Sequence, residues 1–307
     1  MTTRPQQIIV AINPSASFGR GATVGPAVVQ SLRGSGHEVT ALTEPTFADL
    51  TDAARIALRR HPDALVVVGG DGMVSLGTNL VAGSRVPLGI VPSGTGNDMA
   101  RGLGIPLGDT EAAIEALIEA LRRPPRVIDA AIVRRDGLPD LWVASVISAG
   151  FDAVVNERAN LMSWPRGRNR YNLALLRELV FLKSLGYRFT IDGVETSTHG
   201  LLVSVGNNSS IGGGMMVTPD ARLDDGLLDV FVVQPLSRIQ FLRLFPRVFR
   251  GTHVTDPRVS ITRGRRITIE AEGVIAYADG ERVGALPIEI EVVPGALRVL
   301  APPPVVR

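Results

Sequence analysis

Short apolar runs alternate with amphipathic segments in the front part of the chain. Between the runs, apolar residues recur every three or four positions, as on one face of a helix. Strands that alternate with helices form a parallel sheet with right-handed crossovers. The strand at 65–68 is apolar throughout, which predicts that helices cover both of its faces. We expect strands at 8–12, 39–42, 65–68 and 86–91. We also expect two helices: one that Asp49 caps, with Leu50, Ala54, Ala57 and Leu58 on its apolar face, and one at 110–121.

The pattern changes near residue 127, where strand-like segments begin to dominate. Asp-Gly pairs begin at residues 136, 192, 225 and 279, and such pairs are typical of tight turns between antiparallel strands. The pattern predicts an antiparallel β domain, from residue 129 to 295, behind an α/β domain. Its expected strands are 127–133, 141–148, 201–205, 228–233, 267–272 and 288–293, interrupted by helices at 171–185 and 237–250.

Composition agrees with two folded domains and excludes several kinds of chemistry. A chain of 307 residues is long for one core, and 45% hydrophobic with 20% charged residues is a globular composition. The chain has no cysteine, which excludes disulfides, thiolate metal sites and a cysteine nucleophile. Its four histidines are scattered, which disfavours a zinc hydrolase. The cations are dispersed arginines, apart from Lys183, and aromatic residues are few, so we expect no nucleic-acid partner.

Neither a signal peptide nor a membrane span is expected. Residues 1–7 are polar, and the longest apolar run, 141–151, is far shorter than the roughly 20 residues of a spanning helix. We expect a cytoplasmic protein that is peripheral at the inner membrane face. Segments 164–171 and 241–250 combine arginine with apolar residues, so they could rest on anionic lipid. For either segment, however, the sequence favours a helix packed in the core, with arginine on its solvent-exposed face.

The strongest local motif follows the strand at 65–68 and consists of Gly69, Gly70, Asp71 and Gly72. Glycines at the carboxyl end of a parallel strand let the backbone approach phosphate oxygens, and the next helix N-terminus favours anions. A carboxylate among phosphates is repulsive unless Mg²⁺ lies between them, so Asp71 indicates a metal–nucleotide site. A tight turn in which Asp71 caps the following helix is an equally good interpretation of this motif alone.

A second loop of the same kind follows the strand at 86–91. Residues 92–101 contain Gly94, Thr95, Gly96, Asn97 and Asp98, which supply glycines, a hydroxyl and a second carboxylate. The first strand also runs into small hydroxyl residues, at 13–21. The P-loop and Rossmann fingerprints are absent from these strand ends, so we expect a different phosphate cradle.

Two acidic turns in the back part could also carry chemistry. Residues 219–230 place four aspartates near one turn, where oxygens could hold a hard cation. Asp279 and Glu281 flank a glycine, and one of them could take the proton from an attacking hydroxyl. Ordinary hairpin turns explain both segments as well.

Together these motifs resemble the diacylglycerol kinase catalytic family, in its bacterial soluble lipid-kinase branch, over nearly the whole chain. The set comprises Asn13-Pro14, Gly69 to Gly72, Pro92 to Asp98, Gly212 to Gly214, Pro219 to Gly226, Asp279 to Glu281 and Pro294 to Leu297. The resemblance implies an α/β nucleotide-binding domain at 1–128, completed by 296–307, and a C-terminal β-sandwich, with the active site between them. It implies ATP as the donor with Mg²⁺, a membrane lipid as the substrate, and a homodimer, since dimers are common in this branch.

The resemblance also carries residue roles. Glu281 matches the proposed proton acceptor, and Asp279 a catalytic aspartate networked with Asp71 and Asp98. Asp225, with the carbonyls of Arg222 and Leu227, matches a structural metal site. Met73, Ser75 and Leu76 stand where the family usually has Thr, Asn and Glu. The positions that match or adjoin the nucleotide site are Asn13, Pro14, Ser15, Ala16, Ser17, Thr43, Gly69, Gly70, Asp71, Gly72, Met73, Val74, Ser75, Leu76, Gly94, Thr95 and Asn97.

The function expected from the sequence is therefore an ATP-dependent kinase that phosphorylates diacylglycerol. Phosphorylation of a sphingoid base or another lipid alcohol is one alternative. An NAD kinase-like enzyme is another, because that family shares Gly-Gly-Asp-Gly. A non-catalytic nucleotide or lipid sensor is a third, which Met73 and Leu76 leave open.

Overall fold

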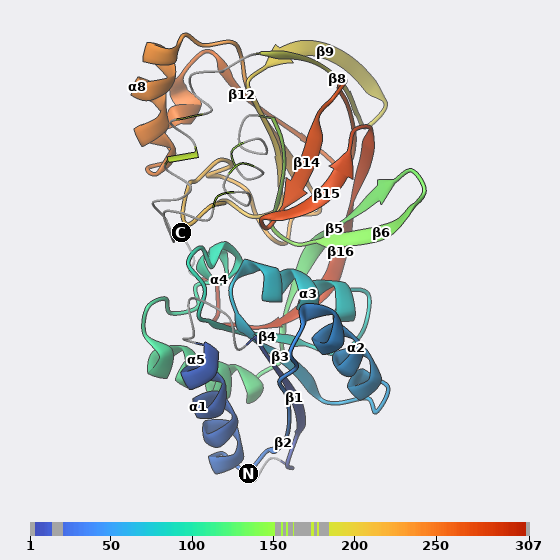
Figure 1. Cartoon of the computed structure of the whole chain (residues 1–307), viewed down its shortest axis with the longest axis vertical. Coiled ribbons are helices and arrows are strands. Elements are labelled where there is room, and N and C mark those ends of the chain that lie inside the picture. The colour runs from blue at the N-terminus through green and yellow to red at the C-terminus, as the bar shows by residue number, and fades with distance from the viewer. Residues whose placement is uncertain are drawn as a thin grey trace. The chain divides into compact units, whose positions relative to one another are not determined.

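The computed structural model describes residues 4–13, 21–150 and 184–304, with isolated positions 155, 158, 162, 173, 174 and 177 (Figure 1). The described chain forms two compact units, Met1–Ile128 with Gly295–Arg307, and Asp129–Pro294. Within the described residues, no helix is long and apolar enough to cross a membrane.

The first unit is built on a parallel sheet, as the alternating pattern predicts. The strand order is β2 (Glu38–Leu42), β1 (Gln7–Ile12), β3 (Ala64–Gly69) and β4 (Leu88–Pro92), all parallel. The end of β16 (Ile288–Leu300) pairs in parallel with β4, Val299 opposite Leu88 and Leu300 opposite Gly89. The last residues of the described chain thus complete the first unit.

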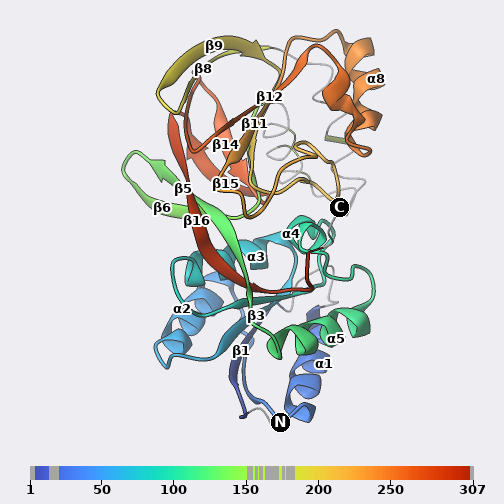
Figure 2. The same ribbon diagram turned by 180° about the vertical axis from the view of Figure 1, so that it is seen from behind.

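Helices cover both faces of this sheet (Figures 1 and 2). The helices α1 (Gly21–Gly34) and α5 (Thr110–Leu121) contact each other on one side. On the other side lie α2 (Phe47–Leu58) and α3 (Asp71–Val81), and the short helix α4 (Asp98–Gly102) follows β4. Every residue of β3 is buried, which confirms that this apolar strand is covered on both faces.

One predicted cap is wrong. The N-cap of α2 is Thr46, and Asp49 lies in the first turn. The Thr46 hydroxyl oxygen accepts a hydrogen bond from the Asp49 N–H (3.1 Å), while the hydroxyl lies 2.7 Å from Asp49 Oδ2. A threonine at the N-cap satisfies a free N–H of the first turn, and Asp49 then interacts favourably with the helix dipole.

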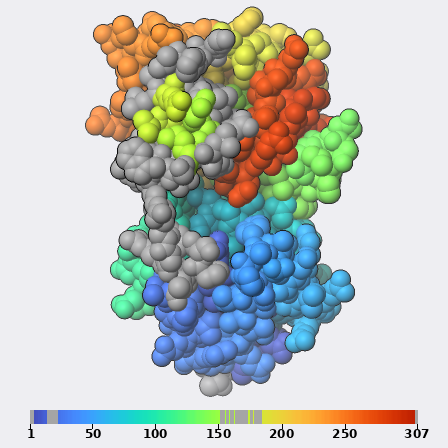
Figure 3. All heavy atoms as spheres, viewed as in Figure 1, coloured from blue at the N-terminus to red at the C-terminus, as the bar shows by residue number. Residues whose placement is uncertain are grey.

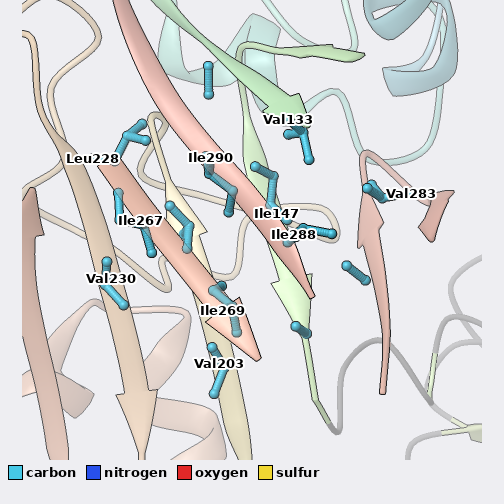
Figure 4. Packing of buried hydrophobic residues seen from close by; sticks show 14 of the residues in the cluster. Val133, Ile147, Val203, Leu228, Val230, Ile267, Ile269, Val283, Ile288 and Ile290 are labelled. Atoms are coloured by element: carbon cyan, nitrogen blue, oxygen red, sulfur yellow. The ribbon is translucent and has the colours of Figure 1, made fainter. Parts of the chain in front are cut away.

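The second unit is an antiparallel sandwich, which confirms the predicted fold class. One sheet has the order β12-β11-β10-β7-β14-β15, and the other layer contains β16, β13, β8 and β9 with β5 and β6. Valine, isoleucine and leucine side chains from both sheets fill the space between them (Figure 4). The strands are β5 (Arg126–Arg135), β6 (Leu138–Val143), β7 (Val146–Ala149), β8 (Leu185–Ile191), β9 (Val194–Gly200), β10 (Leu202–Gly206), β11 (Leu228–Val233), β12 (Val259–Gly264), β13 (Arg266–Glu270), β14 (Ile275–Ala278) and β15 (Glu281–Ala285).

Strand β11 is buried on both of its faces. Leu228, Val230 and Val232 belong to the core between the two sheets. The alternate residues Phe231 and Val233 belong to a second cluster, which includes Leu244 and Val248 from α8 (Arg238–Val248). Because side chains alternate across a strand, burial of all six residues requires this second layer.

The back part departs from the sequence prediction at three places. The expected strand at 141–148 is two strands, β6 and β7, because the Ala144 and Ser145 carbonyls accept hydrogen bonds from Asn207. The expected strand at 288–293 continues to Leu300 as one long strand, β16. Leu185 begins β8 instead of ending a helix, although Leu173, Ala174 and Arg177 are helical.

Candidate functional site

The strand ends that carry the predicted nucleotide residues lie side by side. Asn13 follows β1, and its N–H donates to the Val68 carbonyl of β3 (3.3 Å). Ser93 follows β4, and its N–H donates to the Gly69 carbonyl (2.9 Å). Thr43 follows β2, the neighbour of β1. Since these strands are parallel, Asn13, Thr43 and the glycine loops share one edge of the sheet.

The two glycine loops are in direct backbone contact. A Cβ built on Gly94 would lie 2.3 Å from Gly70 Cα, and one built on Gly70 would lie 3.0 Å from Gly94 Cα. A Cβ on Gly96 would lie 2.4 Å from Asp71 Oδ2. Glycine is therefore required at 94 and 96 for a close approach, and the loops form a cradle lined by main chain.

Asp71 joins the two loops. The N-cap of α3 is Gly70, without a side-chain hydrogen bond, so the sequence interpretation in which Asp71 caps its own helix is wrong. Instead, Asp71 Oδ1 accepts from the Asp98 N–H (2.8 Å), and Oδ2 accepts from the Asn97 N–H (2.9 Å). The carboxylate thus satisfies main-chain donors where α4 begins, 26 and 27 residues further along the chain.

Asn97 closes the second loop upon itself. Its side-chain Nδ2 donates to the Gly94 carbonyl (2.8 Å), and its Oδ1 accepts from the Gly94 N–H (3.0 Å). Asn97 adopts the left-handed conformation (φ 55°), which asparagine tolerates better than most residues. This asparagine therefore fixes the shape of the loop with both its side chain and its backbone.

The site is electrostatically strained at Asp71. Burial, and after it the neighbouring Asp98 charge, raise the pKa of this carboxyl to about 6, against the N–H donors that lower it. Asp98 is itself buried, with 4% of its side chain exposed, and lies 3.8 Å from Arg101 Nε. Two close carboxyl groups in a poorly solvated place favour a cation or a proton beside them.

The residues after Asp71 divide into two groups. Met73, Val74 and Leu76 are 2%, 4% and 5% exposed, so their side chains belong to the core of the unit. A Cβ on Gly69 would lie 2.4 Å from Met73 Cγ, which shows the methionine lying directly under the loop. Ser75 is half-buried and Thr95 is exposed. The predicted positions Pro14, Ser15, Ala16 and Ser17 lie outside the described residues.

Comparison with known proteins decides the family. The model of the diacylglycerol kinase catalytic domain matches residues 7–130, and that of the YegS C-terminal NAD kinase beta sandwich-like domain matches residues 145–301. The chain is 38% identical over 297 residues to a diacylglycerol kinase of Mycobacterium tuberculosis, covering 96% of this chain and 95% of that one. This chain belongs to the diacylglycerol kinase catalytic family.

More distant relatives agree with this assignment. A diacylglycerol kinase of Bacillus subtilis is 28% identical over 266 residues, covering 85% of each chain. A diacylglycerol kinase of Bacillus anthracis str. Sterne has a crystal structure with a TM-score of 0.74 to this one, at 24% identity and 99% coverage of each chain. That structural likeness shows the common fold, from the parallel sheet of the first unit to the sandwich of the second.

In this kinase, the acidic turn before β11 is held by an arginine. Arg263 of β12 donates to Asp225 Oδ2 (2.8 Å) and to Asp229 Oδ1 (3.2 Å). Burial raises the pKa of Asp229, and Arg263 opposes this shift. Asp225 Oδ1 also accepts from the Leu227 N–H (3.2 Å), and Arg222 lies 3.7 Å from Asp224. Among the described residues, no group of three or more histidine, aspartate or glutamate side chains is arranged to hold a metal ion. The metal site at Arg222, Asp225 and Leu227 therefore stays a prediction.

Asp279 and Glu281 occupy the hairpin between β14 and β15. Asp279 (φ 52°) and Gly280 (φ 82°) both adopt the left-handed conformation that such a tight turn requires, and Glu281 begins β15 with its side chain exposed. The catalytic roles of Glu281 and Asp279 remain predictions. Of the four predicted catalytic carboxylates, the first unit brings Asp71 and Asp98 together, while the hairpin brings Asp279 and Glu281 together.

Sequence reasoning missed a buried polar cluster around Asp129. Its Oδ2 accepts from the Gly226 N–H (2.6 Å), while its carbonyl accepts from Asn207 Nδ2 (2.9 Å). Asp129 and Asn207 are 3% and 1% exposed. A lone aspartate between Ile128 and Ala130, inside an apolar strand, was the signal that could have found it, because a buried carboxylate needs partners.

Proposed function

We propose that this kinase transfers the γ-phosphoryl group of ATP to the hydroxyl of diacylglycerol, giving phosphatidic acid. The observation that carries the proposal is the contact between two glycine loops, which Asp71 joins at the carboxyl edge of the sheet. Relatives named diacylglycerol kinase support the choice of substrate.

The residues at the sheet edge suit a nucleotide triphosphate. Glycines at 94 and 96 leave no room for side chains, so a phosphate would meet main chain there. Asn13, Thr43 and Thr95 would add polar groups at the same edge. Asp71 and Asp98 would hold Mg²⁺, directly or through water, since the raised pKa of Asp71 reflects a place where positive charge is favoured. When bound, Mg²⁺ neutralises phosphate charge during the transfer.

The transfer needs positioning and one proton acceptor. The lipid hydroxyl oxygen would form a bond to the γ-phosphorus while the bond from that phosphorus to the leaving oxygen of ADP breaks. The hydroxyl proton would pass to Glu281, or to Asp279 beside it. Glu281 is exposed at the start of β15, so its carboxylate is open to an approaching hydroxyl, as a general base must be.

The test is phosphorylation with radiolabelled ATP against diacylglycerol, sphingosine, undecaprenol and NAD. We expect product from diacylglycerol, and a Glu281→Gln turnover reduced by two orders of magnitude or more at unchanged Tm. Glu272→Gln removes an exposed carboxylate of the same unit and serves as the matched control. Near-normal turnover in Glu281→Gln overturns its role as base, and labelling of NAD or another lipid instead of diacylglycerol overturns the proposed substrate.

A further inference from the structure

Helix α8 carries apolar residues on two opposite faces. Phe241, Leu244 and Val248 face inward and are 2%, 5% and 8% exposed. We call the opposite set the outer stripe: Ile239, Leu242, Pro246 and Phe249. Its spacing of three, four and three residues places these side chains in one row along the helix and its C-cap.

The outer stripe is exposed although it is apolar. Ile239, Leu242 and Phe249 are 64%, 51% and 50% exposed. The Phe249 ring packs edge-on against Phe245 (5.7 Å between centroids), which stacks in turn on the buried Phe241. Phe249 is therefore held in place by the core and presents a fixed apolar surface.

Arginines flank the outer stripe, and residues 238–250 contain no acidic residue. On a helical wheel, Arg243 and Arg250 lie on one side of the stripe and Arg238 on the other. Within the described part of the chain, Arg243 and Arg250 form none of the ion pairs, whereas Arg247 lies 3.8 Å from Asp256 and donates to the Thr252 carbonyl (2.6 Å). The side chains of α8, orange in Figure 3, reach the surface of the molecule.

Charge decides what covers this face. A second copy packed stripe against stripe would bring arginines against arginines, because an isologous contact pairs each patch with itself. An anionic bilayer offers phosphates to Arg243 and Arg250, and an apolar layer beneath them to Leu242 and Phe249. The combination fits the interface of such a bilayer: a capped amphipathic helix, exposed large apolar residues, and two arginines, Arg243 and Arg250, with no ion pair among the residues that the structure describes.

We propose that the outer stripe of α8 and its flanking arginines dock this protein on an anionic lipid bilayer, an inference that rests on the proposed function for the need to reach a membrane substrate. The stripe would sit at the level of the acyl-chain boundary, with the guanidinium groups among the headgroup phosphates. Docking would hold the enzyme at the surface where its lipid substrate resides.

The test is co-sedimentation, without ATP, with vesicles of phosphatidylcholine alone or mixed in equal parts with phosphatidylglycerol. We expect binding only to the mixed vesicles, and weaker binding at high salt because exposed charges are screened. Leu242→Ser with Phe249→Ser should weaken binding about tenfold. Arg243→Gln with Arg250→Gln should weaken it on the order of thirtyfold. Ile56→Ser with Val194→Ser, at positions 61% and 68% exposed elsewhere, should change nothing.

Tm and analytical ultracentrifugation accompany each variant. The four substituted residues, on α8 and in the turn that follows it, are all exposed, so the fold should persist. Unchanged vesicle binding in both α8 variants overturns the proposal. Loss of a dimer in Leu242→Ser with Phe249→Ser, without an effect on vesicles, overturns it in favour of a second copy. Turnover of a short-chain diacylglycerol dispersed without a bilayer separates the two proposals: if it persists in the α8 variants, the catalytic assignment stands whether or not docking does.

Discussion

The interactions of Asp71 have opposite effects on the charge of its carboxyl group. Its carboxylate accepts main-chain hydrogen bonds that hold two loops together, and it lies beside a second buried acid. The hydrogen bonds favour the ionised form, while burial and the Asp98 charge disfavour it. The balance leaves the pKa of Asp71 at about 6, so the joint between the loops should respond to pH.

The free energy of unfolding should depend on pH because Asp71 titrates with a shifted pKa. The pKa of Asp71 rises from 3.8 in a free carboxyl to about 6, so the folded state binds its proton more tightly than the unfolded state. The resulting stability is fully present below about pH 4 and is lost as pH rises through 6. Relative to Asp71→Asn, the parent protein should lose about 2 kcal/mol between pH 4 and pH 7, measured by urea unfolding. A constant difference between the two proteins across that range contradicts the shifted pKa.

The contact between Gly70 and Gly94 leads to a second prediction at this scale. Gly94→Ala places a methyl group 2.3 Å from Gly70 Cα, so the loops must separate. We expect a loss of at least about 2 kcal/mol of stability, and at least a tenfold weaker affinity for Mg-ATP in titration calorimetry. Gly34→Ala, where the added methyl meets nothing within 4 Å, is the control and should leave both quantities nearly unchanged.

Among the elements, strand β11 contributes side chains to two separate hydrophobic clusters. Its even-numbered residues lie between the two sheets, and Phe231 and Val233 lie under α8. Phe231 also meets the ring of the buried His253 edge-on, at 5.3 Å between centroids. Burial keeps the pKa of His253 low, so this contact is apolar in character.

Truncation of this aromatic residue should therefore be costly. We expect Phe231→Ala to lower the free energy of unfolding by about 3–5 kcal/mol, because the cavity would lie between the sheet and α8. The measurement is urea unfolding followed by circular dichroism. Phe47→Ala makes the same change at a side chain that is 50% exposed and should cost less than about 1 kcal/mol. Equal losses in the two variants would mean that Phe231 does not anchor α8.

Element prediction from the sequence succeeded where burial and local signals agree. The helix at Thr110–Leu121 begins after Asp109, whose side chain caps it, and α8 begins after Ser237, which forms a capping box with Gln240. The edge strand β9 was missed, because its residues are mostly exposed and show no alternation. The break between β6 and β7 was missed because its cause, Asn207, lies more than 60 residues away in sequence.

The same distinction holds for the site. The glycine loops could be found because a buried strand followed by glycines is a local pattern. The hydrogen bonds from Asn97 and Asp98 to Asp71 could not, since they depend on the register of β3 against β4. In the sequence, α8 is only a segment that mixes arginine with apolar residues. Which of its two apolar stripes faces the core could not be predicted, because that depends on packing in the folded unit.

At the scale of the whole chain, β16 links distant parts of the sequence. Its first residues pair with β13 in the second unit, and its last residues pair with β4 in the first. Leu300 is 4% exposed and lies opposite Gly89. The stability of an early strand therefore depends on residues more than 200 positions later.

Hydrogen exchange can measure this dependence. We expect Leu300→Ala to lower stability by about 2–5 kcal/mol and to increase amide exchange in β3 and β4. Leu138→Ala, at a leucine 52% exposed on β6, should leave exchange in both strands unchanged. Protection of β4 that is the same in Leu300→Ala as in the parent would show that the C-terminal strand contributes little to the first unit.

The position of β16 beside β4 has a consequence for synthesis. While the ribosome is still making the sandwich, the nascent chain already contains β4 but not residues 299 and 300, which later pair with it. Until those residues emerge, β4 presents an apolar edge with unpaired backbone groups, a template for association with other chains. Chaperones that shield exposed strands during translation should therefore matter more for the yield of this protein than for one whose early sheet closes with early residues.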